Sequence, residues 1–458
     1  MTTGTPEPRE HDADDVVVPQ DAPVGPVLNF QTPQLGARGL LRSGAIVSVV
    51  ALLTNGFNVV FHFVLARFMG PSEYSLLTTM FAVFLIASVP LIAIQSTVAR
   101  DMATLMGRGD ERDASIVLRS SLRTVFRAGT ITVVVAMILF YPMIAILHVD
   151  RPLPILAVVV AFLVQIPGPL VSGALQASER FWVLSWTQAM QSGLKLGAGV
   201  ALAALGFGAS AVMFGFAGAT MASLVVMLFV VRPILDLSRG EHVPASRIIG
   251  GYAIGAALTL GCNTVLTNAD LLWARAGLTP HEAGLYAAVS VATGVILLIP
   301  IGLNTVLFVR VARLAPTDGA RQHLLLGLVT VAAIATPCVI ALAVIPVPLL
   351  HLGFGSAYDD AAPWLWPLGL SMAFYALAVV YLNHLLALGR SSIALVMVSV
   401  IALQELLLLQ FHHSGMQIVG VQIACSIVLL LACEGFLVVT NRRSRNTGLE
   451  RQALGETT

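Results

Sequence analysis

Apolar runs of about 20 residues recur along almost the whole chain, and they constrain its fold more than any other feature. Each run is long enough to cross about 30 Å of hydrocarbon as an α-helix. Only 11% of the residues are charged, whereas soluble globular domains carry about 25%. The sequence therefore predicts an all-α polytopic membrane protein. Its net charge of +1 gives no reason to expect a nucleic-acid partner.

We predict twelve transmembrane helices, with the N- and C-termini in the cytoplasm. In that orientation 21 of the 24 arginines fall in cytoplasmic segments, and only Arg67, Arg151 and Arg275 fall outside. This distribution satisfies the positive-inside rule, and all five tryptophans fall at predicted interfaces, where amphipathic rings are favoured. The helices are expected near 43–65, 76–98, 125–147, 153–175, 184–206, 210–231, 251–273, 285–308, 325–350, 364–387, 392–412 and 416–440.

Polar segments divide the chain further. Residues 1–40 are rich in acids and proline, which predicts a disordered cytoplasmic tail. The four cysteines fall in apolar runs without a C-x-x-C pair, so we expect neither disulfides nor a metal site. The expected order after the tail is an N-lobe with six helices (41–232), a cytoplasmic linker (233–249), a C-lobe with six helices (250–440) and a basic cytoplasmic tail (441–458).

The two six-helix halves share a pattern. A shift of 208 residues places Asn55 on Asn263 and Arg67 on Arg275, and it sets His62 opposite Asp270. With one further residue, "PSEYSLL" (71–77) aligns with "PHEAGLY" (280–286). Such a parallel repeat predicts two lobes with a central cleft, which is a transporter architecture.

Five segments, in register, carry a resemblance to a known family. They are "ARFMGPSEYSLL" (66–77), "GALQASERF" (173–181), "GLYAAVSVATG" (284–294), "LGFGSAYDDAAPWL" (352–365) and "LLALGRSSIAL" (385–395). Together they resemble the oligosaccharide flippases of the multidrug/oligosaccharidyl-lipid/polysaccharide (MOP) superfamily. Two positions depart from the pattern, because Ser75 and Ala177 stand where glycines are usual.

This resemblance covers roughly 40–440 and implies a fold and a function. The fold is a V-shaped bundle of two lobes, like that of the multidrug and toxin extrusion (MATE) transporters. The function is to move polyprenyl-pyrophosphate-linked oligosaccharide from the cytoplasmic to the outer leaflet for surface polysaccharide biosynthesis, by alternating access. Members with 14 helices that handle peptidoglycan precursor need two more helices than this chain is expected to have.

Lys195 is the only lysine of the chain, and it falls near the middle of the predicted fifth helix. A charge at the centre of a bilayer costs about 2.5–3.5 kcal/mol on insertion scales, so such a residue usually faces a cavity or a partner. We interpret Lys195 as a cation for the substrate pyrophosphate. The alternatives are that it snorkels along its stem or pairs with an acid of another helix.

Six further residues are candidates for binding the pyrophosphate or the sugar. The guanidinium groups of Arg67 and Arg275 match phosphate geometry. A structural role, with lipid headgroups or nearby glutamates as partners, is the favoured alternative for both. The remaining candidates are amides, for which hydrogen bonding between helices is an equally good explanation: Asn55, Asn58, Asn263 and Gln191.

Three residues are candidates for coupling transport to an ion. Asp270 lies seven residues after Asn263, so the two share a helix face, and His62 is its equivalent in the repeat. Glu405 is the other deeply placed acid. Intramembrane acids commonly carry protons or bind ions, so Asp270 and Glu405 are candidate sites for a proton or Na⁺. Packing between helices is the alternative for each.

Two other functions stay open. A MATE-type ion-coupled cation or drug antiporter predicts an acid-dominated cavity, against which Lys195 argues and for which Asp270 and Glu405 argue. A non-transporting membrane scaffold of a polysaccharide assembly complex predicts that these charges are dispensable.

The sequence contains no catalytic constellation and no glycine-rich phosphate loop, so we expect neither an enzyme nor a cofactor. The expected partners are lipid-linked oligosaccharide and membrane lipids, with polysaccharide polymerase and glycosyltransferases as further candidates. The use of arginine in place of lysine suggests a GC-rich bacterium, and hence the inner or plasma membrane.

Overall fold

The computed structural model describes residues 37–123, 152–236, 251–299, 318–388 and 392–453. The predicted third helix, almost all of the N-terminal tail and most of the linker between lobes lie outside these ranges. Two compact units are present, Met1–Ala45 and Ile46–Thr458. The contacts described below are those within the second unit.

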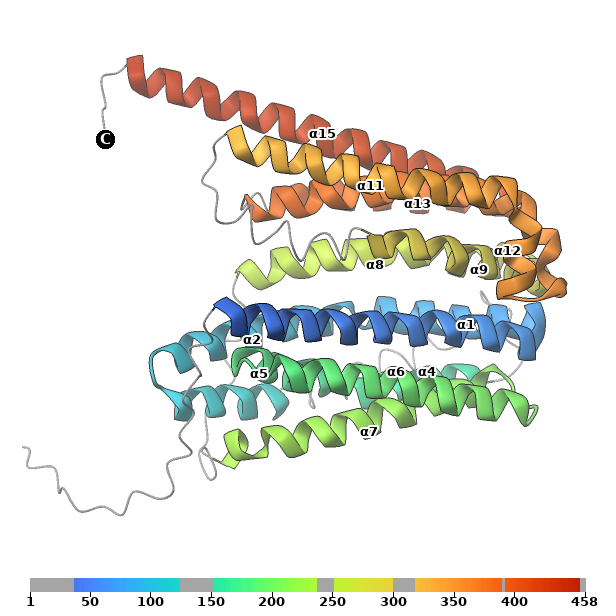
Figure 1. The fold of residues 1–458 in the computed structure, drawn as a ribbon, viewed down its shortest axis with the longest axis horizontal. Helices are drawn as coiled ribbons and strands as arrows, with labels where there is room; N and C mark the ends of the chain where they lie inside the picture. Colours follow the sequence, from blue (N-terminus) through green and yellow to red (C-terminus); the bar gives the residue numbers. More distant parts are fainter. Residues whose placement is uncertain (1–36, 124–151, 237–250, 300–317, 389–391, 454–458) are drawn as a thin grey trace, which may run out of the picture. The chain divides into compact units, whose positions relative to one another are not determined.

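The described part of the first half is built from helices alone (Figure 1). After Gly107 a helical segment occupies 111–123. The breaks at Ser88 and at 166–167 adjoin prolines, which cannot donate a backbone hydrogen bond inside a helix. The helices are α1 (Ala37–Ala87), α2 (Val89–Gly107), α4 (Leu153–Gln165), α5 (Gly168–Ala177), α6 (Phe181–Ala204) and α7 (Ala209–Asp236).

Helices also make up the described part of the second half. In this half α13 packs on α11 and α15, and α14 packs on α8 and α15, while α2 of the first half packs on α8. The elements are α8 (Gly251–Gly277), α9 (Pro280–Gly294), η1 (Val295–Leu297), α11 (Asp318–Val344), α12 (Pro346–Gly353), η2 (Ser356–Ala361), α13 (Ala362–Ala387), α14 (Ile393–Gln410) and α15 (Gly415–Ala453).

Helix α1 contains two helical segments that meet at Gly70. This glycine has φ 70° and ψ 169°, a left-handed conformation that a residue without a Cβ adopts at little cost. Pro71 then begins the next segment, where its fixed φ suits the first turn and its missing N–H costs no hydrogen bond. The turn reverses the chain between the first and second predicted membrane spans, and it belongs to the same "MGPSEY" stretch that carries the family resemblance.

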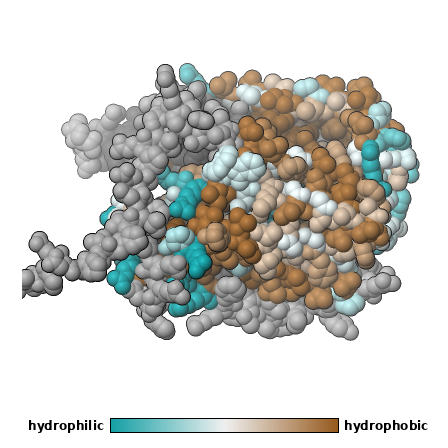
Figure 2. All heavy atoms as spheres, turned by 60° about the horizontal axis from the view of Figure 1, so that its bottom comes forward, coloured by the Kyte–Doolittle hydropathy of each residue, from teal (hydrophilic) through white to brown (hydrophobic). Residues whose placement is uncertain are grey.

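Seven helices among the described residues are long and apolar enough to cross a membrane. Helix α6, which contains Lys195, is not among them, and the predicted total of twelve stays a prediction. Apolar residues cover most of the coloured surface in Figure 2, as expected of side chains that face lipid. Helix α15 continues to Ala453, beyond the predicted end of its span at residue 440.

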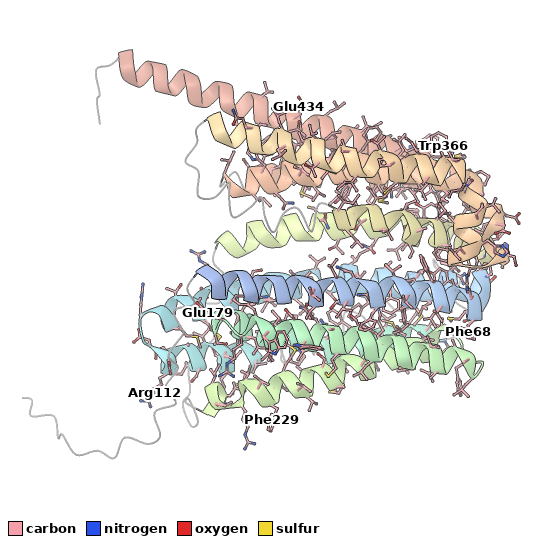
Figure 3. The ribbon with its side chains drawn as sticks, viewed as in Figure 1. Phe68, Arg112, Glu179, Phe229, Trp366 and Glu434 are labelled. Atoms are coloured by element: carbon pink, nitrogen blue, oxygen red, sulfur yellow. The ribbon has the colours of Figure 1, made fainter. Side chains whose placement is uncertain are left out.

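The buried residues form three apolar clusters. Two belong to the first half, around Leu170 and around Phe216. The third belongs mainly to the second half but also includes Ala66, Tyr74 and Ala82 of α1. The second segment of α1 therefore packs against both halves. In Figure 3, Phe68 and Trp366 lie toward one end of the bundle, and Arg112 and Glu179 lie toward the other.

Candidate functional site

Lys195 lies in a buried aromatic cage in the first half. Its side chain is 8% exposed, and its Nζ donates a hydrogen bond of 2.5 Å to Oδ1 of Asn58 on α1. The same nitrogen lies 4.2 Å from the ring centre of Phe61, 5.1 Å from that of Phe81 and 6.0 Å from that of Phe216. Ring faces attract cations at these distances, more strongly when water is excluded.

The cage depends on a close approach between α6 and α1. Gly199 faces Phe61, and a Cβ at this glycine would lie only 2.8 Å from Cε2 of that ring. Within the described ranges no carboxylate pairs with Lys195, which leaves an amide oxygen and three rings as its partners. The alternative interpretation, in which Lys195 pairs with an acid of another helix, is therefore not the arrangement found among the described residues.

Three other predicted residues lie near this cage on α1 and α6. The His62 ring is in edge contact with Phe61 and Phe81, two of the rings around Lys195, and its Nδ1 is 3.1 Å from the Tyr74 hydroxyl. Gln191 donates 2.8 Å to the Thr220 hydroxyl of α7. Asn55 is half-buried on α1, one turn before Asn58. The structure therefore brings Asn58 into contact with Lys195, with His62 close by.

Asp270 is fully buried in α8 of the second half. Its Oδ2 accepts a hydrogen bond of 2.6 Å from the Tyr286 hydroxyl of α9. Its other oxygen, Oδ1, is buried and has no hydrogen-bond partner in the described part of the chain. A buried polar atom without a partner costs about 1–3 kcal/mol, so it marks a place where a proton, an ion or a water molecule would be bound favourably.

Glu405 of α14 repeats this pattern. Its Oε2 accepts a hydrogen bond of 2.8 Å from the Trp273 indole of α8. Its Oε1 is buried and has no hydrogen-bond partner among the described residues. Asp270 and Glu405 lie on helices that pack together, α8 and α14. Asn263 lies on the same face of α8 as Asp270, seven residues earlier. It accepts a hydrogen bond of 2.7 Å from the Tyr375 hydroxyl of α13. The predicted coupling acids therefore share one region of the second half.

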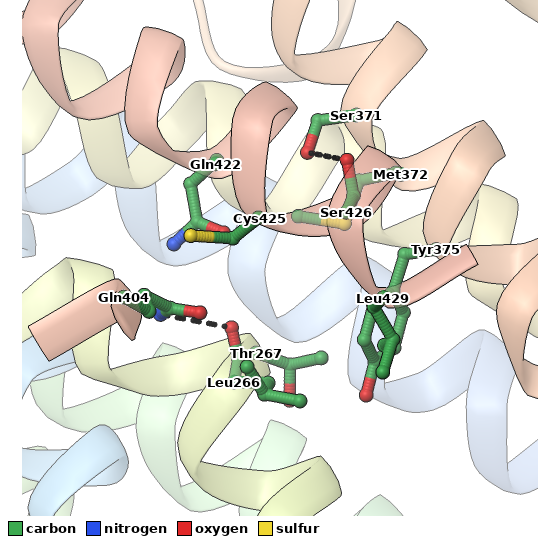
Figure 4. Close-up of a pocket in the computed structure, with 10 residues that line it drawn as sticks. All are labelled: Leu266, Thr267, Ser371, Met372, Tyr375, Gln404, Gln422, Cys425, Ser426 and Leu429. Atoms are coloured by element: carbon green, nitrogen blue, oxygen red, sulfur yellow. Dashed lines mark hydrogen bonds between the residues drawn. The ribbon is translucent and has the colours of Figure 1, made fainter. Parts of the chain in front are cut away.

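A small pocket lined by both polar and apolar side chains lies among α8, α13, α14 and α15 (Figure 4). Gln404 donates a hydrogen bond of 3.3 Å to the backbone oxygen of Leu266. The Ser371 hydroxyl donates one of 3.2 Å to the Ser426 hydroxyl. The Nε2 of Gln422 is buried without a partner in the described ranges. The free volume of about 10 Å³ is on the order of one water molecule.

The two repeat-related arginines both lie at the end of the bundle that carries Gly70. Arg67 donates to the backbone oxygens of His351 and Leu352, and Arg275 donates 2.7 Å to the Ser75 hydroxyl. The nearby glutamates have other partners. Glu73 accepts 3.0 Å from the Ala209 amide at the start of α7, and Glu282 caps α9 through Thr279.

Sequence reasoning missed the aromatic partners of these groups. Tyr74, Tyr286, Trp273 and Tyr375 each hold one of the predicted polar side chains through a hydroxyl or an indole. Each sits on a different helical segment from the residue it binds, so no spacing in the sequence signals the pair. Among these four, Tyr74 and Tyr286 had a local signal, because they fall in the segments "ARFMGPSEYSLL" and "GLYAAVSVATG".

Comparison with known proteins now assigns the family. A family model described as polysaccharide biosynthesis protein matches residues 64–363. The chain belongs to the polysaccharide biosynthesis protein family. The match confirms the family that the sequence segments resemble; it contains the first three of them and most of the fourth, and 385–395 lies beyond it. No curated protein sequence matches this family member.

Solved structures of MOP-superfamily transporters share the fold of this family member. Lipid II flippase MurJ in an inward closed conformation aligns with a TM-score of 0.67 at 11% identity, over 86% of this chain and 87% of that chain. An inward-facing multidrug resistance MATE transporter aligns with a TM-score of 0.62 at 14% identity, over 86% and 95%. An outward-facing MATE transporter aligns with a TM-score of 0.60 at 14% identity, over 88% of this chain and 95% of that chain. These likenesses establish the fold.

Proposed function

We propose that the protein is a flippase that moves polyprenyl-pyrophosphate-linked oligosaccharide to the outer leaflet for surface polysaccharide biosynthesis. The family supports the pathway, and the likeness to a lipid II flippase supports a lipid-linked substrate. The proposed mechanism is alternating access in the inner or plasma membrane of a bacterium, with both termini in the cytoplasm.

The observation that carries this proposal is the Lys195 cage. A buried ammonium opposed by an amide and three rings, with no carboxylate partner in the described chain, has no counter-charge of its own. A pyrophosphate would supply that charge together with several hydrogen-bond acceptors. In this mechanism Asn58 and the rings hold the side chain until the anion enters, and the flexible four-carbon stem then lets the ammonium follow it.

The amides near the cage have a matching role. Asn55, Asn58 and Gln191 are donors and acceptors on the two helices that form the cage, and they suit the hydroxyls of a sugar. In the second half, Asp270 and Glu405 each present one oxygen without a partner in the described chain, which supports a coupling proton or Na⁺ there. We assign Asn263 and His62 to the polar walls around these two centres.

A second function is favoured by one specific observation. Two buried acids with unpaired oxygens among the described residues would also suit a cationic substrate, as in a MATE-type antiporter. That function places the substrate at Asp270 and Glu405 and leaves Lys195 without a role.

The test uses a strain that lacks the protein and is complemented with wild type, Lys195→Ala or Lys195→Arg. We expect lipid-linked oligosaccharide to accumulate on the cytoplasmic face without the protein and with Lys195→Ala, and to be cleared by wild type. Lys195→Arg should clear it in part, because it keeps the charge but not the compact ammonium. Each variant is compared at equal membrane levels.

Two outcomes would contradict the proposal. If the strain without the protein accumulates no lipid-linked intermediate but loses efflux of cationic dyes, the antiporter is correct. If intermediate accumulates without the protein but variants at Lys195, Asp270 and Glu405 all clear it normally, the roles proposed for these charges are wrong, and dispensable charges are what a non-transporting scaffold predicts.

A further inference from the structure

One end of the bundle holds the two halves of the chain together. There, residues 63–75 of the first half contact residues 275–284 and 351–358 of the second half, and we call these three segments the clasp end. The rings of Phe63 and Phe354 meet with centres 4.9 Å apart, and those of Tyr74 and Tyr358 meet at 6.1 Å. These apolar contacts surround a set of polar bonds that cross between the halves.

The first of these bonds comes from the second half. Arg275 is 8% exposed and donates to the hydroxyl of Ser75, which is 1% exposed. That hydroxyl donates in turn to the backbone oxygen of Ser72. Ser75 stands where the resembling segment of the family carries glycine, so the residue that departs from the pattern is the one that accepts the arginine.

The second bond comes from the first half. Arg67 donates to the backbone oxygens of His351 and Leu352 in the last turn of α12. The His351 carbonyl also accepts 3.0 Å from the Gly355 amide, and a cation is favoured at a helix C-terminus. Arg67 and Arg275 are equivalent in the repeat, and each reaches across to the other half.

Backbone contacts complete the clasp end. The Tyr358 hydroxyl donates 3.0 Å to the backbone oxygen of Ala66. A Cβ on Gly284 would lie 2.0 Å from the backbone oxygen of Pro71, so only glycine permits this approach. Gly284 is the repeat equivalent of Ser75. Because glycine offers no hydroxyl, Arg67 cannot copy the bond of Arg275 and uses the carbonyls of α12.

From this geometry we propose that Arg67 and Arg275 are clasp residues, which hold this end shut and must release their partners before it opens. Their guanidinium groups are engaged with the opposite half and serve the conformational step of transport. The inference goes beyond the proposed function, because it concerns the closure of this end and does not depend on which substrate passes.

The experiment measures access to the clasp end in the full-length protein in nanodiscs. Ala66 is fully buried and packs in the cluster that is otherwise almost entirely of the second half. Ala66→Cys is introduced after the four native cysteines are replaced by alanine, and its rate of maleimide labelling is measured. We expect Arg275→Gln to raise that rate about tenfold, since a bond to a charged donor is lost. The more exposed Arg67→Gln should raise it less.

Two further variants make the test specific. Ser75→Gly keeps Arg275 but removes its acceptor, along with the local bond to Ser72, and restores the residue usual in the family, so it should raise labelling even if Arg275→Gln folds poorly. Glu282→Gln is the matched control, because this exposed acid at the same end bonds within its own half, and labelling should not change.

Binding of a polyprenyl pyrophosphate probe, measured in the same nanodiscs, separates the clasp from a substrate role. If the arginines form a clasp, labelling rises while affinity for the probe stays within about twofold. Loss of a charged contact with the probe would lower the affinity by more than that. If labelling is unchanged in Ser75→Gly and Arg67→Gln, the clasp is wrong. If affinity falls with labelling unchanged, the arginines bind substrate.

Discussion

The two halves of the chain carry equivalent polar positions but opposite unmatched charges. In the first half, His62 and Asn58 accompany an ammonium that lies among rings. In the second half, Asp270 takes the repeat position of His62, and it lies with Glu405 among tyrosine and tryptophan donors. The predicted repeat therefore pairs a cationic centre in the first half with an acidic centre in the second.

This difference has a physical meaning. Each half is held together by the same kind of interhelical bond, in which an aromatic residue fixes a polar side chain. Only the charge that is left without a partner differs, and a buried charge without a partner is costly. We therefore expect the first half to recognise the anionic part of a substrate and the second half to take up a cation.

The largest expected effect follows from removing the cation of the first half. Lys195→Gln should weaken binding of polyprenyl pyrophosphate by about 30-fold or more, because loss of one partner of a buried charge pair costs at least ~2 kcal/mol. Titration of nanodisc-embedded protein measures it. Asn55→Ala, one turn before Asn58 on α1, is the control. Asn55 is proposed to bond the sugar, which this probe lacks, so affinity should change less than about threefold. Equal affinity for the Lys195→Gln variant and wild type would remove the distinction between the halves.

The next effect comes from giving the ammonium a partner. Asn58→Asp places a carboxylate where the amide oxygen now lies 2.5 Å from Lys195. We expect roughly tenfold slower flipping with unchanged or higher thermal stability, because an internal ion pair competes with the pyrophosphate. Flipping assays in proteoliposomes and a melting curve measure both. Asn58→Ala, which adds no charge, separates competition from loss of the amide. Faster flipping in Asn58→Asp would show that the free ammonium is not the binding group.

A smaller effect is expected from the acids. Asp270→Asn and Glu405→Gln keep an oxygen for the Tyr286 hydroxyl and the Trp273 indole but cannot carry a negative charge. We expect each variant to lower ion-driven flipping about fivefold while probe affinity stays unchanged. Transport with and without an imposed proton or Na⁺ gradient tests this. If these variants lose probe affinity instead, the acidic centre belongs to the substrate site.

The smallest effect concerns two hydrogen bonds between helices. Asn263→Leu breaks the bond to the Tyr375 hydroxyl, and interhelical bonds in membranes are worth about 0.6 kcal/mol on average. A modest fall in melting temperature with unaltered transport is therefore expected. Gln191→Leu loses the Thr220 bond in the first half at a similar cost in stability, but it should also slow flipping, because Gln191 is proposed to bond the sugar. A strong loss of flipping in one variant alone would show that its amide contacts substrate.

The sequence predicted the class of the protein more fully than its site. Apolar run length and composition act locally, so they indicate helices without knowledge of packing, and the five segments identified the family. The position of Lys195, Asp270 and Glu405 inside apolar runs was also readable from the sequence, and their depth in a bilayer stays a prediction. The kink at Gly70 follows from a Gly-Pro pair, whose backbone preferences are intrinsic.

The partners of those charges could not be predicted. Lys195 and Asn58 are 137 residues apart, and Trp273 and Glu405 are 132 apart. The sequence left open whether Lys195 pairs with an acid, and the structure places an amide and three rings around it instead. The sequence also left open whether Arg67 pairs with Glu73. In the structure Glu73 instead accepts a hydrogen bond from the Ala209 amide at the start of α7.

The sequence by itself determined that this is a helical membrane protein of a polysaccharide biosynthesis family, with few charges at bilayer depth. Those properties depend on side-chain chemistry counted along the chain. Only the tertiary structure decided which charges are matched and that both repeat-related arginines cross to the opposite half. The physical reason is that hydrogen bonds act over about 3 Å, so they depend on which helices pack together and at what register.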